Sequence, residues 1–481
     1  MVNFISCMRL NLIFGAFVLY KKFRQGMLFQ VVDSRYVSKL YLYIPWFLYA
    51  KAAAHGALGD SSQASRYARL LGATFPLPFL KFRLAKYLGR TQPNLVSELL
   101  GPVRPGNYLR IAFELVNGAK PSSLGFVNYR ASGMHAVLWN NRLASTAAGR
   151  IESINQLLLH YDCTRVQWAK EQPVPLSYFV GLRPAVSVQF SGAVSAPLVS
   201  LLVTAYNCGA YVRQSLYSLL AQTYTNIQIL VVNDASTDDT WHQLSLLQGA
   251  DPRLHIFNLS RNVGTYAAKS LLLQFAQGEY VVCHDSDDLA DPTLVATSLA
   301  ALLADAGRVA VISNWFRVDE ELRIFPGAVR RFWPLLSINH SSLMLRTAVL
   351  RQIGGWDVPR VAADTELFER VRAIYGRRAV YQLPQPLTIG SFRSDSLMND
   401  PQVGAMQAEA FRRRVEYRET WVQWHEQCKK RGIRPTMASP FDPDRPFAVP
   451  DEFKVCPEDI ATNFEAMKTQ TSLPWSPSSG A

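Results

Sequence analysis

The stretch Leu198-Val-Ser-Leu-Leu-Val-Thr-Ala-Tyr-Asn207 decides the fold, because a mostly apolar run long enough for a buried strand ends there in polar residues. Outward from it, apolar runs alternate with helical patterns. Further strands are expected at 227–232, 255–259 and 280–283, and helices at 211–222, 237–247 and 266–276. This alternation predicts an α/β fold with a mostly parallel, Rossmann-like sheet that is covered by helices on both faces.

Polar clusters follow three of these strands, at 204–207, 233–236 and 284–288. The carboxyl ends of parallel strands lie at one edge of a sheet, and ligands bind outside that edge. We therefore expect the three clusters to form one binding site.

The last of these clusters is the acidic sequence Asp285-Ser-Asp-Asp288. Crowded carboxylates repel one another unless a cation or strong hydrogen-bond donors offset their charge. Mg²⁺ is commonly held by one or two carboxylates, with substrate phosphates and water completing its shell. The cluster thus predicts a divalent cation, Mn²⁺ or Mg²⁺, as cofactor.

The segment from Val199 to about Met398 resembles the family 2 glycosyltransferases, which are inverting enzymes of the GT-A fold, similar to those that build bacterial capsules, lipopolysaccharides and exopolysaccharides. The resemblance rests on ordered pieces: Val203-Thr-Ala-Tyr-Asn207, Val232-Asn-Asp-Ala-Ser-Thr-Asp238, Asn262-Val-Gly264, Gly278-Glu-Tyr280, Asp285-Ser-Asp-Asp288, Gly354-Gly-Trp-Asp357 and Ala363-Asp-Thr-Glu-Leu-Phe-Glu-Arg370. It implies transfer of a sugar from a nucleotide-sugar donor, first of all a UDP-sugar, to a glycan or lipid-linked acceptor. No nucleic acid partner is expected.

On the donor side, the resemblance implies that six residues contact the nucleotide: Thr204, Tyr206, Asp234, Asn262, Asp285 and Arg393. It also implies that Asp287 and His340 ligate the metal ion. Structural alternatives stay open, in which Thr204 only ends a strand, Tyr206 only packs in the core, and Asp234 caps the turn that follows it. His340 could equally be an ordinary core or surface histidine. Lys269 and Arg393 could reach a phosphate or be ordinary surface charges.

On the acceptor side, the resemblance implies that Asp364 is the base that takes the proton of the attacking hydroxyl. Trp356 and Asp357 are expected to contact the acceptor, since an aromatic face can stack on a sugar and a carboxylate can accept from its hydroxyls. Glu366 is expected instead to pair with Arg370 four positions later on a helix.

Two positions depart from the family pattern. Ala205 stands where proline or serine is frequent, and Asn233 replaces the first of two consecutive aspartates. The second acid, Asp234, is retained. The identity of the nucleotide therefore stays open.

The rest of the chain suggests four parts: an apolar and basic N-terminal segment over 1–50, an α-helical domain over 51–190, the GT-A domain over 197–400, and a helix with a loosely ordered tail over 401–481. The apolar run from Leu10 to Tyr20 is too short to span a bilayer, which takes roughly 20 residues. The alternatives for it are core packing and contact with an anionic membrane face.

Composition sets broad limits. The net charge of +13 favours anionic partners such as nucleotide phosphates or an acidic membrane surface. The six cysteines are far apart and form no dense framework, which fits a reducing cytoplasm. We therefore expect a cytoplasmic protein. Any membrane contact is expected to be peripheral, on the inner face of the cell membrane.

Two other readings remain open. A sugar-phosphate nucleotidyltransferase uses a related sheet, but the loop Thr204-Ala-Tyr-Asn-Cys-Gly209 lacks the glycine-rich, basic character usual there. A catalytically degenerate binding scaffold is the second, and the joint presence of Asp234, Asp287 and Asp364 argues against it.

Overall fold

The structure, a computed structural model, describes residues 18–25, 27–32, 45–74, 78–88, 92–100, 114, 133–168, 182–184, 196–325, 335–437 and 444–475. The apolar run from Leu10 to Tyr20 lies outside these ranges except for its last three residues. Within the described ranges, no helix combines the length and the apolar character that crossing a bilayer requires.

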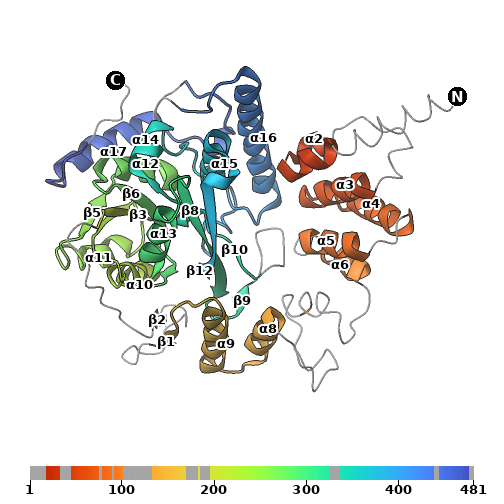
Figure 1. The fold of residues 1–481 in the computed structure, drawn as a ribbon, viewed down its shortest axis with the longest axis horizontal. Coiled ribbons are helices and arrows are strands. Elements are labelled where there is room, and N and C mark those ends of the chain that lie inside the picture. The colour runs from red at the N-terminus through yellow and green to blue at the C-terminus, as the bar shows by residue number, and fades with distance from the viewer. Residues whose placement is uncertain are drawn as a thin grey trace. The chain divides into compact units, whose positions relative to one another are not determined.

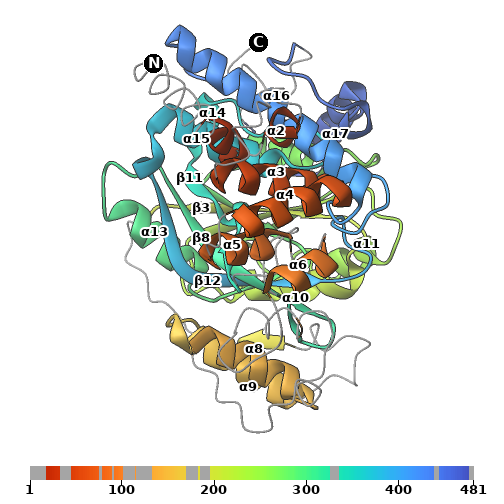
Figure 2. The same cartoon turned by 90° about the vertical axis from the view of Figure 1, so that its right-hand side faces the viewer.

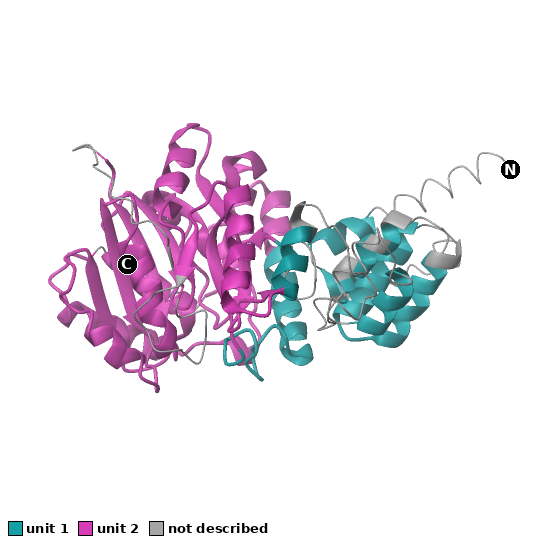
Figure 3. Cartoon of the chain, turned by 90° about the horizontal axis from the view of Figure 1, so that it is seen from below, with its two compact units in different colours: residues 1–143, 325–335, 394–423 teal, residues 144–324, 336–393, 424–481 magenta. Residues whose placement is uncertain are grey.

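The chain forms two compact units, shown in Figure 3. The first contains residues 1–143, 325–335 and 394–423, and the second contains residues 144–324, 336–393 and 424–481. These ranges do not coincide with the four parts expected from the sequence. Whether those parts fold independently stays a prediction.

The first unit is helical among its described residues (Figure 2). Its helices are α2 (Leu28–Val32), α3 (Pro45–Ala57), α4 (Ser61–Thr74), α5 (Pro78–Leu88), α6 (Pro93–Leu100), α8 (Gly133–Leu143) and residues 408–423 of α16 (Ala408–Arg431). Phe47, Leu48 and Tyr49 of α3 are buried, so this side of α3 packs in the core of the unit.

The second unit is built on a large sheet, drawn in Figure 1. In the described residues its strands are β3 (Val199–Ala205), β4 (Ile227–Asn233), β5 (Leu254–Asn258), β6 (Tyr280–Asp285), β7 (Leu289–Ala290), β8 (Ala310–Asp319), β9 (Ile324–Phe325), β10 (Ser337–Ile338), β11 (Met344–Arg346) and β12 (Val380–Phe392). Their order is β5-β4-β3-β6-β11-β8-β12-β7, with β9 and β10 paired to β8.

The longer strands of this sheet share one direction. β5, β4, β3 and β6 are mutually parallel, as are β8 and β12. The short strands β7, β10 and β11 are antiparallel to their neighbours. The predicted α/β fold with a mostly parallel sheet is confirmed.

Helices pack on the sheet and connect its strands. They are α10 (Gly209–Leu220), α11 (Thr240–Ser245), α12 (Gly264–Phe275), α13 (Leu294–Leu303), α14 (Thr347–Gln352), α15 (Ala363–Tyr375) and α17 (Pro457–Thr469). Leu202, Phe257 and Leu271 belong to one buried cluster that joins β3 and β5 to α12, and Met467 of α17 lies in the same cluster. The loosely ordered tail expected at the C-terminus is therefore wrong for the region of α17.

The N-terminal part of the second unit contains α9 (Ala147–His160) and a two-stranded ribbon of β1 (Val166–Trp168) and β2 (Leu182–Pro184). The Thr146 side chain caps α9 by accepting a hydrogen bond from the backbone N–H of Gly149.

Candidate active site

The carboxyl ends of β3, β4 and β6 bring three of the polar clusters together. Thr204 on β3 lies in register with Asp285 on β6, and Ala205 lies in register with Asn233 on β4. Asp234 follows Asn233 directly. Because the three strands are parallel neighbours, Thr204, Asp234 and Asp285 lie at one edge of the sheet.

Asp234 is held in place by a second loop. Its carboxylate accepts hydrogen bonds from the backbone N–H groups of Val263 and Gly264, both at 2.8 Å, and from Nδ2 of Asn262 at 3.0 Å. Burial raises the pKa of Asp234 to about 6, although the two backbone hydrogen bonds oppose that shift. Asp234 thus caps the start of α12 rather than the turn that follows it in sequence, and Asn262 lies beside it as part of the same group.

Tyr206 follows β3 and is 47% exposed, so the alternative in which it only packs in the core is wrong. Thr204 hydrogen-bonds through Oγ1 to Oγ1 of Thr265, at 2.7 Å. Thr204 and Tyr206 therefore lie beside Asp234 and Asn262, and the ring of Tyr206 is open to solvent.

The three carboxylates of the acidic cluster have different surroundings. Asp285 accepts hydrogen bonds from Ser341 Oγ at 2.9 Å and lies 3.6 Å from Nζ of Lys269. Burial favours a higher pKa for Asp285, but the Lys269 ammonium and the Ser341 hydroxyl outweigh it and hold the pKa below its ordinary value. Asp285 is therefore an ionised, firmly oriented carboxylate.

Asp287 pairs with Arg393, whose Nε lies 3.0 Å from Oδ2. Arg393 is 7% exposed, donates through Nη1 to the carbonyl oxygen of Asn207 at 3.0 Å, and lies over the ring of Tyr211 at 5.1 Å. The guanidinium thus joins the acidic cluster to the loop that carries Tyr206.

Asp288 is 4% exposed and accepts a hydrogen bond from the backbone N–H of Ser391 at 2.9 Å. Burial, together with the neighbouring Asp287 and Asp285 charges, raises the pKa of Asp288 well above its ordinary value. Its role in this structure is to tie the acidic loop to the end of β12.

The side chains at this site fit a cation that is coordinated partly by the protein and partly by a bound ligand. Among the described residues, no group of three His, Cys, Asp or Glu side chains could hold a metal ion. Asp287 keeps 22% of its side chain exposed and could supply one carboxylate, which suits Mg²⁺ or Mn²⁺ bound partly by phosphates. His340 packs its ring edge-to-face on Phe368 at 5.3 Å, and its role as a metal ligand stays a prediction.

Asp364 lies in the first turn of α15, two residues after Ala362, whose φ is +72°. It is half-buried and accepts a hydrogen bond from the backbone N–H of Thr365 at 2.7 Å. Lys269, which is 4% exposed, is attracted by both Asp285 and Asp364, and this outweighs the effect of burial and raises its pKa. The buried ammonium pairs with Asp285, and the charge of Asp364 adds to its stabilisation.

Residues 200–364 match the sequence model described as glycosyl transferase family 2. This part of the chain is therefore similar to the family 2 glycosyltransferases. Its match spans the loops that carry Thr204, Asp234, Asp285 and Asp364, while Arg393 and the C-terminal helices lie beyond it.

Curated relatives match parts of the chain. The chain is 33% identical over 135 residues to a chondroitin synthase of Pasteurella multocida, covering 28% of this chain and 14% of that protein. It is 32% identical over 189 residues to the glycosyltransferase GlyG of Streptococcus pneumoniae, covering 38% of this chain and 61% of that protein. The match thus spans less than two thirds of either relative.

A solved structure of Staphylococcus aureus TarS (residues 1–349) in complex with UDP-GlcNAc is 18% identical, with a TM-score of 0.34, over 46% of this chain and 66% of that chain. This level of structural similarity is too low to transfer any position from one structure to the other.

Two residues expected on the acceptor side of the transferase domain are buried. Trp356 is 5% exposed and belongs to the same core cluster as α12, and Asp357 is fully buried with its carboxylate paired to Arg445. Neither offers a sugar an open face in this structure. The double glycine before them turns the chain inward, so sequence pattern alone did not distinguish a core position from a surface loop.

The expected pair of Glu366 and Arg370 is confirmed. Both side chains are fully buried, with Oε2 of Glu366 2.9 Å from Nη2 of Arg370. Arg370 also donates to the carbonyl oxygens of Ile353 and Gly355, both at 2.6 Å. Glu366 therefore orients Arg370 and has no free carboxylate for catalysis.

Sequence reasoning left out several residues of the transferase domain. Ser341 is adjacent to His340 and could have been found from that position. Lys269 was expected to contact a phosphate or to be a surface charge, but it is buried and pairs with Asp285 at 3.6 Å. Arg360, which donates to Oδ1 of Asn262 at 2.7 Å, and Arg445 gave no local signal.

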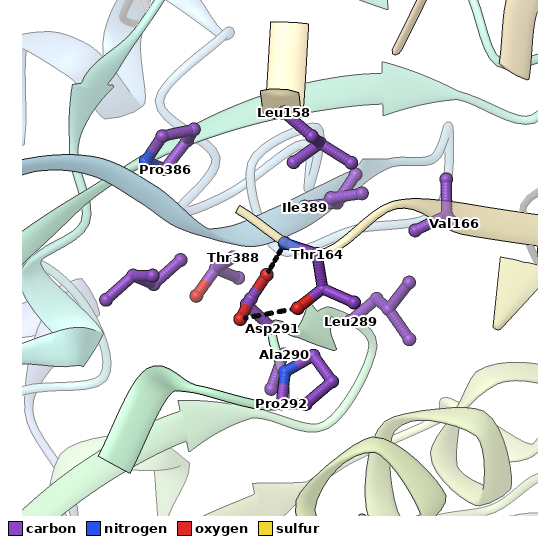
Figure 4. A pocket seen from close by; sticks show the side chains of 11 residues that line it. Leu158, Thr164, Val166, Leu289, Ala290, Asp291, Pro292, Pro386, Thr388 and Ile389 are labelled. Atoms are coloured by element: carbon purple, nitrogen blue, oxygen red, sulfur yellow. Dashed lines mark hydrogen bonds between the residues drawn. The ribbon is translucent and has the colours of Figure 1, made fainter. Parts of the chain in front are cut away.

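A pocket elsewhere in this unit is shown in Figure 4. Leu158, Leu289 and Ile389 line it, and the Asp291 carboxylate accepts hydrogen bonds from N and Oγ1 of Thr164, at 2.7 Å and 3.3 Å. None of the predicted site residues lines it. Its polar contacts attach the segment after α9 to β7 and β12.

Proposed function

We propose that the protein is an inverting, metal-dependent glycosyltransferase that moves a sugar from a nucleotide-sugar donor, first of all a UDP-sugar, to a glycan or lipid-linked acceptor. The observation that carries this proposal is the grouping of Thr204, Asp234 and Asp285 at one strand edge, where Nζ of Lys269 lies 3.6 Å from Asp285. The match of residues 200–364 to the family model supplies the reaction class.

In the proposed mechanism, Asp364 accepts the proton of the acceptor hydroxyl as that oxygen attacks the anomeric carbon. The charge of Lys269 keeps Asp285 ionised and attracts Asp364 toward the acidic cluster. A divalent cation held through Asp287 would neutralise the leaving diphosphate. Asp234 and Asn262 would bind the base of the nucleotide, and Tyr206 is exposed beside them.

Arg393 would also serve the donor. A guanidinium is suited to bind phosphate oxygens in a forked arrangement. In this structure it binds Asp287, so contact with a diphosphate requires that it exchange one anionic partner for another.

The setting proposed is bacterial surface-polysaccharide assembly. One curated relative is named UDP-Glc:alpha-D-GlcNAc-diphosphoundecaprenol beta-1,3-glucosyltransferase WfaP of Escherichia coli, 37% identical over 91 residues, which are 19% of this chain and 36% of that protein. A lipid-linked acceptor would bring the protein to the inner face of the membrane, which agrees with the net charge of +13.

A screen of nucleotide sugars for Mn²⁺-dependent donor hydrolysis tests the proposal. We expect one donor to be hydrolysed, and the rate to fall at least about 100-fold in Asp364→Asn and in Asp287→Ala, since each removes a group that acts on the reacting atoms. Asp305→Asn, an exposed carboxylate that pairs only loosely with Arg308 at 3.7 Å, is the matched control.

Two outcomes favour the alternatives. Formation of a nucleotide sugar from a sugar phosphate and a nucleoside triphosphate would identify a nucleotidyltransferase. UDP binding without turnover of any donor, with or without Mn²⁺, would identify a binding scaffold.

A further inference from the structure

The C-terminal part of the second unit contacts two loops of the candidate active site, residues 258–262 and residues 353–362. We call residues 425–437 and 444–470 the C-terminal brace. At the first loop, the Gln470 side chain accepts from N of Asn258 at 2.8 Å and donates to its carbonyl oxygen at 2.9 Å. The Asn463 side chain likewise accepts from N of Ser260 and donates to the carbonyl oxygen of Arg261.

At the second loop, residues 353–362, the brace makes both backbone and charged contacts. N of Met437 donates to the carbonyl oxygen of Ile353 at 3.2 Å, and N of Arg360 donates to the carbonyl oxygen of Phe453 at 2.8 Å. The Arg445 guanidinium pairs with Asp357.

Both loops lead to residues of the proposed mechanism. The first ends at Asn262, which binds Asp234, and the second ends at Ala362, two residues before Asp364. Arg360 Nη1 donates to Oδ1 of Asn262 at 2.7 Å, so the two loops also contact each other. A segment that fixes both loops fixes the donor side and the acceptor side together.

The second loop contains three residues in the left-handed region: Gly354 at φ +92°, Gly355 at +67° and Ala362 at +72°. Glycine adopts this region readily, whereas Ala362 is strained there and keeps this conformation only because surrounding contacts hold it. At Gly354 the brace approaches so closely that a Cβ would lie 2.3 Å from the carbonyl oxygen of Met437. The loop conformation and the brace therefore depend on each other.

Charge reinforces this dependence. Asp357 is fully buried, and a buried carboxylate that loses its partner is strongly unfavourable. At the other end of the loop, His425 Nε2 lies 3.1 Å from Oε1 of Glu366, the residue that orients Arg370 against the carbonyls of Ile353 and Gly355.

We propose that the C-terminal brace is an integral part of the active site and that Arg445 is a positioning residue, which acts through Asp357 on the 353–362 loop and thereby on Asp364. The effect on turnover rests on the proposed role of Asp364. The effect on the loop does not.

The first test is hydrogen exchange of the full chain, compared between wild type, Arg445→Met and Arg434→Met. Arg434 lies in the same brace, is exposed, and provides the matched control. We expect amide exchange within 353–362 to accelerate at least about tenfold in Arg445→Met, with β3 and β4 unchanged. Arg434→Met should match wild type throughout.

The double variant Asp357→Asn/Arg445→Met is measured alongside, because it removes the buried charge together with its partner. Acceleration confined to 353–362 in either variant supports the proposal. Unchanged exchange in both, or equal acceleration across every strand in both, overturns it.

The second test is donor hydrolysis. We expect Arg445→Met to lower kcat at least about tenfold while the donor KM changes less than about twofold, and the double variant to recover part of that loss. Equal changes in kcat and KM, or no change in kcat, would refute the positioning role. If wild type itself hydrolyses no donor, the proposed function fails, and hydrogen exchange still decides whether Arg445 holds the loop.

Discussion

At the scale of single residues, the raised pKa of Asp234 predicts that the proposed nucleotide binding depends on pH. Burial raises this pKa to about 6, so the carboxylate is mostly ionised at pH 7 and mostly protonated at pH 5.5. A protonated carboxyl competes poorly for a base N–H. If only the ionised form binds, UDP affinity should fall about fourfold from pH 7 to pH 5.5.

Calorimetric titration with UDP at the two pH values measures this change. Asp234→Asn should bind UDP more weakly and with little dependence on pH, while Asp305→Asn should behave as wild type. An unchanged pH dependence in Asp234→Asn would assign the titration to another group.

The pair of Asp287 and Arg393 gives a second prediction at this scale. The guanidinium neutralises the carboxylate at 3.0 Å, so a metal ion must compete with it. Arg393→Met should therefore bind Mn²⁺ about tenfold more tightly in the absence of nucleotide, as expected for removal of an adjacent positive charge.

The signal of free Mn²⁺ in electron paramagnetic resonance measures that affinity. Arg434→Met removes a charge from an exposed position and should leave the affinity unchanged, as a test for a general effect of net charge. Weaker Mn²⁺ binding in Arg393→Met would show that the guanidinium supports the metal site instead of competing for it.

At the scale of elements, the contact between the 353–362 loop and the C-terminal brace should appear in stability. Gly354→Ala adds a Cβ that would lie 2.3 Å from a carbonyl oxygen, in addition to the cost of φ at +92°. We expect a loss of about 3 kcal/mol in the free energy of unfolding, the sum of strain and overpacking.

Gly432→Ala is the comparison for this measurement, because φ is +68° there but no atom lies within 4 Å of the added Cβ. It should cost only about 1 kcal/mol in urea denaturation, since the backbone strain alone remains. Equal losses in the two variants would mean that the close approach of Met437 contributes nothing.

The elements that the sequence predicted correctly are those whose signal is local. The apolar runs at β3 and β4 and the i, i+4 spacing of Glu366 and Arg370 each lie within a few residues, and all were confirmed. Arg445 and Asp357 are 88 positions apart, and no spacing rule links them. Trp356 was expected to contact the acceptor, although it is buried. The segment that buries Asp357 beside it lies far away in sequence, so no local pattern shows the burial.

The site residues follow the same division. Asp234 and Asp285 were placed by their position after buried strands, which parallel pairing turns into proximity. The contact of Asp234 with the loop at Asn262 and the pairing of Lys269 with Asp285 depend on how α12 packs on the sheet. A single sequence does not specify that packing.

At the scale of the whole molecule, the charge balance predicts binding to anionic membranes. The chain has 50 Lys and Arg against 37 Asp and Glu residues. An acidic bilayer attracts such an excess, and the attraction weakens as the Debye length falls from about 14 Å to about 6 Å between roughly 50 and 300 mM salt.

Cosedimentation with vesicles of about 30% anionic lipid should therefore retain most of the protein at the lower salt and at least about fivefold less at the higher salt. Vesicles of neutral lipid alone control for apolar insertion, which salt does not weaken. Binding that is equal on both vesicles and insensitive to salt would mean that apolar contact, not charge, brings the protein to the membrane. If the protein binds neither kind of vesicle, its excess positive charge would instead attract the phosphates of the donor and acceptor. A lipid-linked acceptor would then have to reach the active site without help from the bilayer surface.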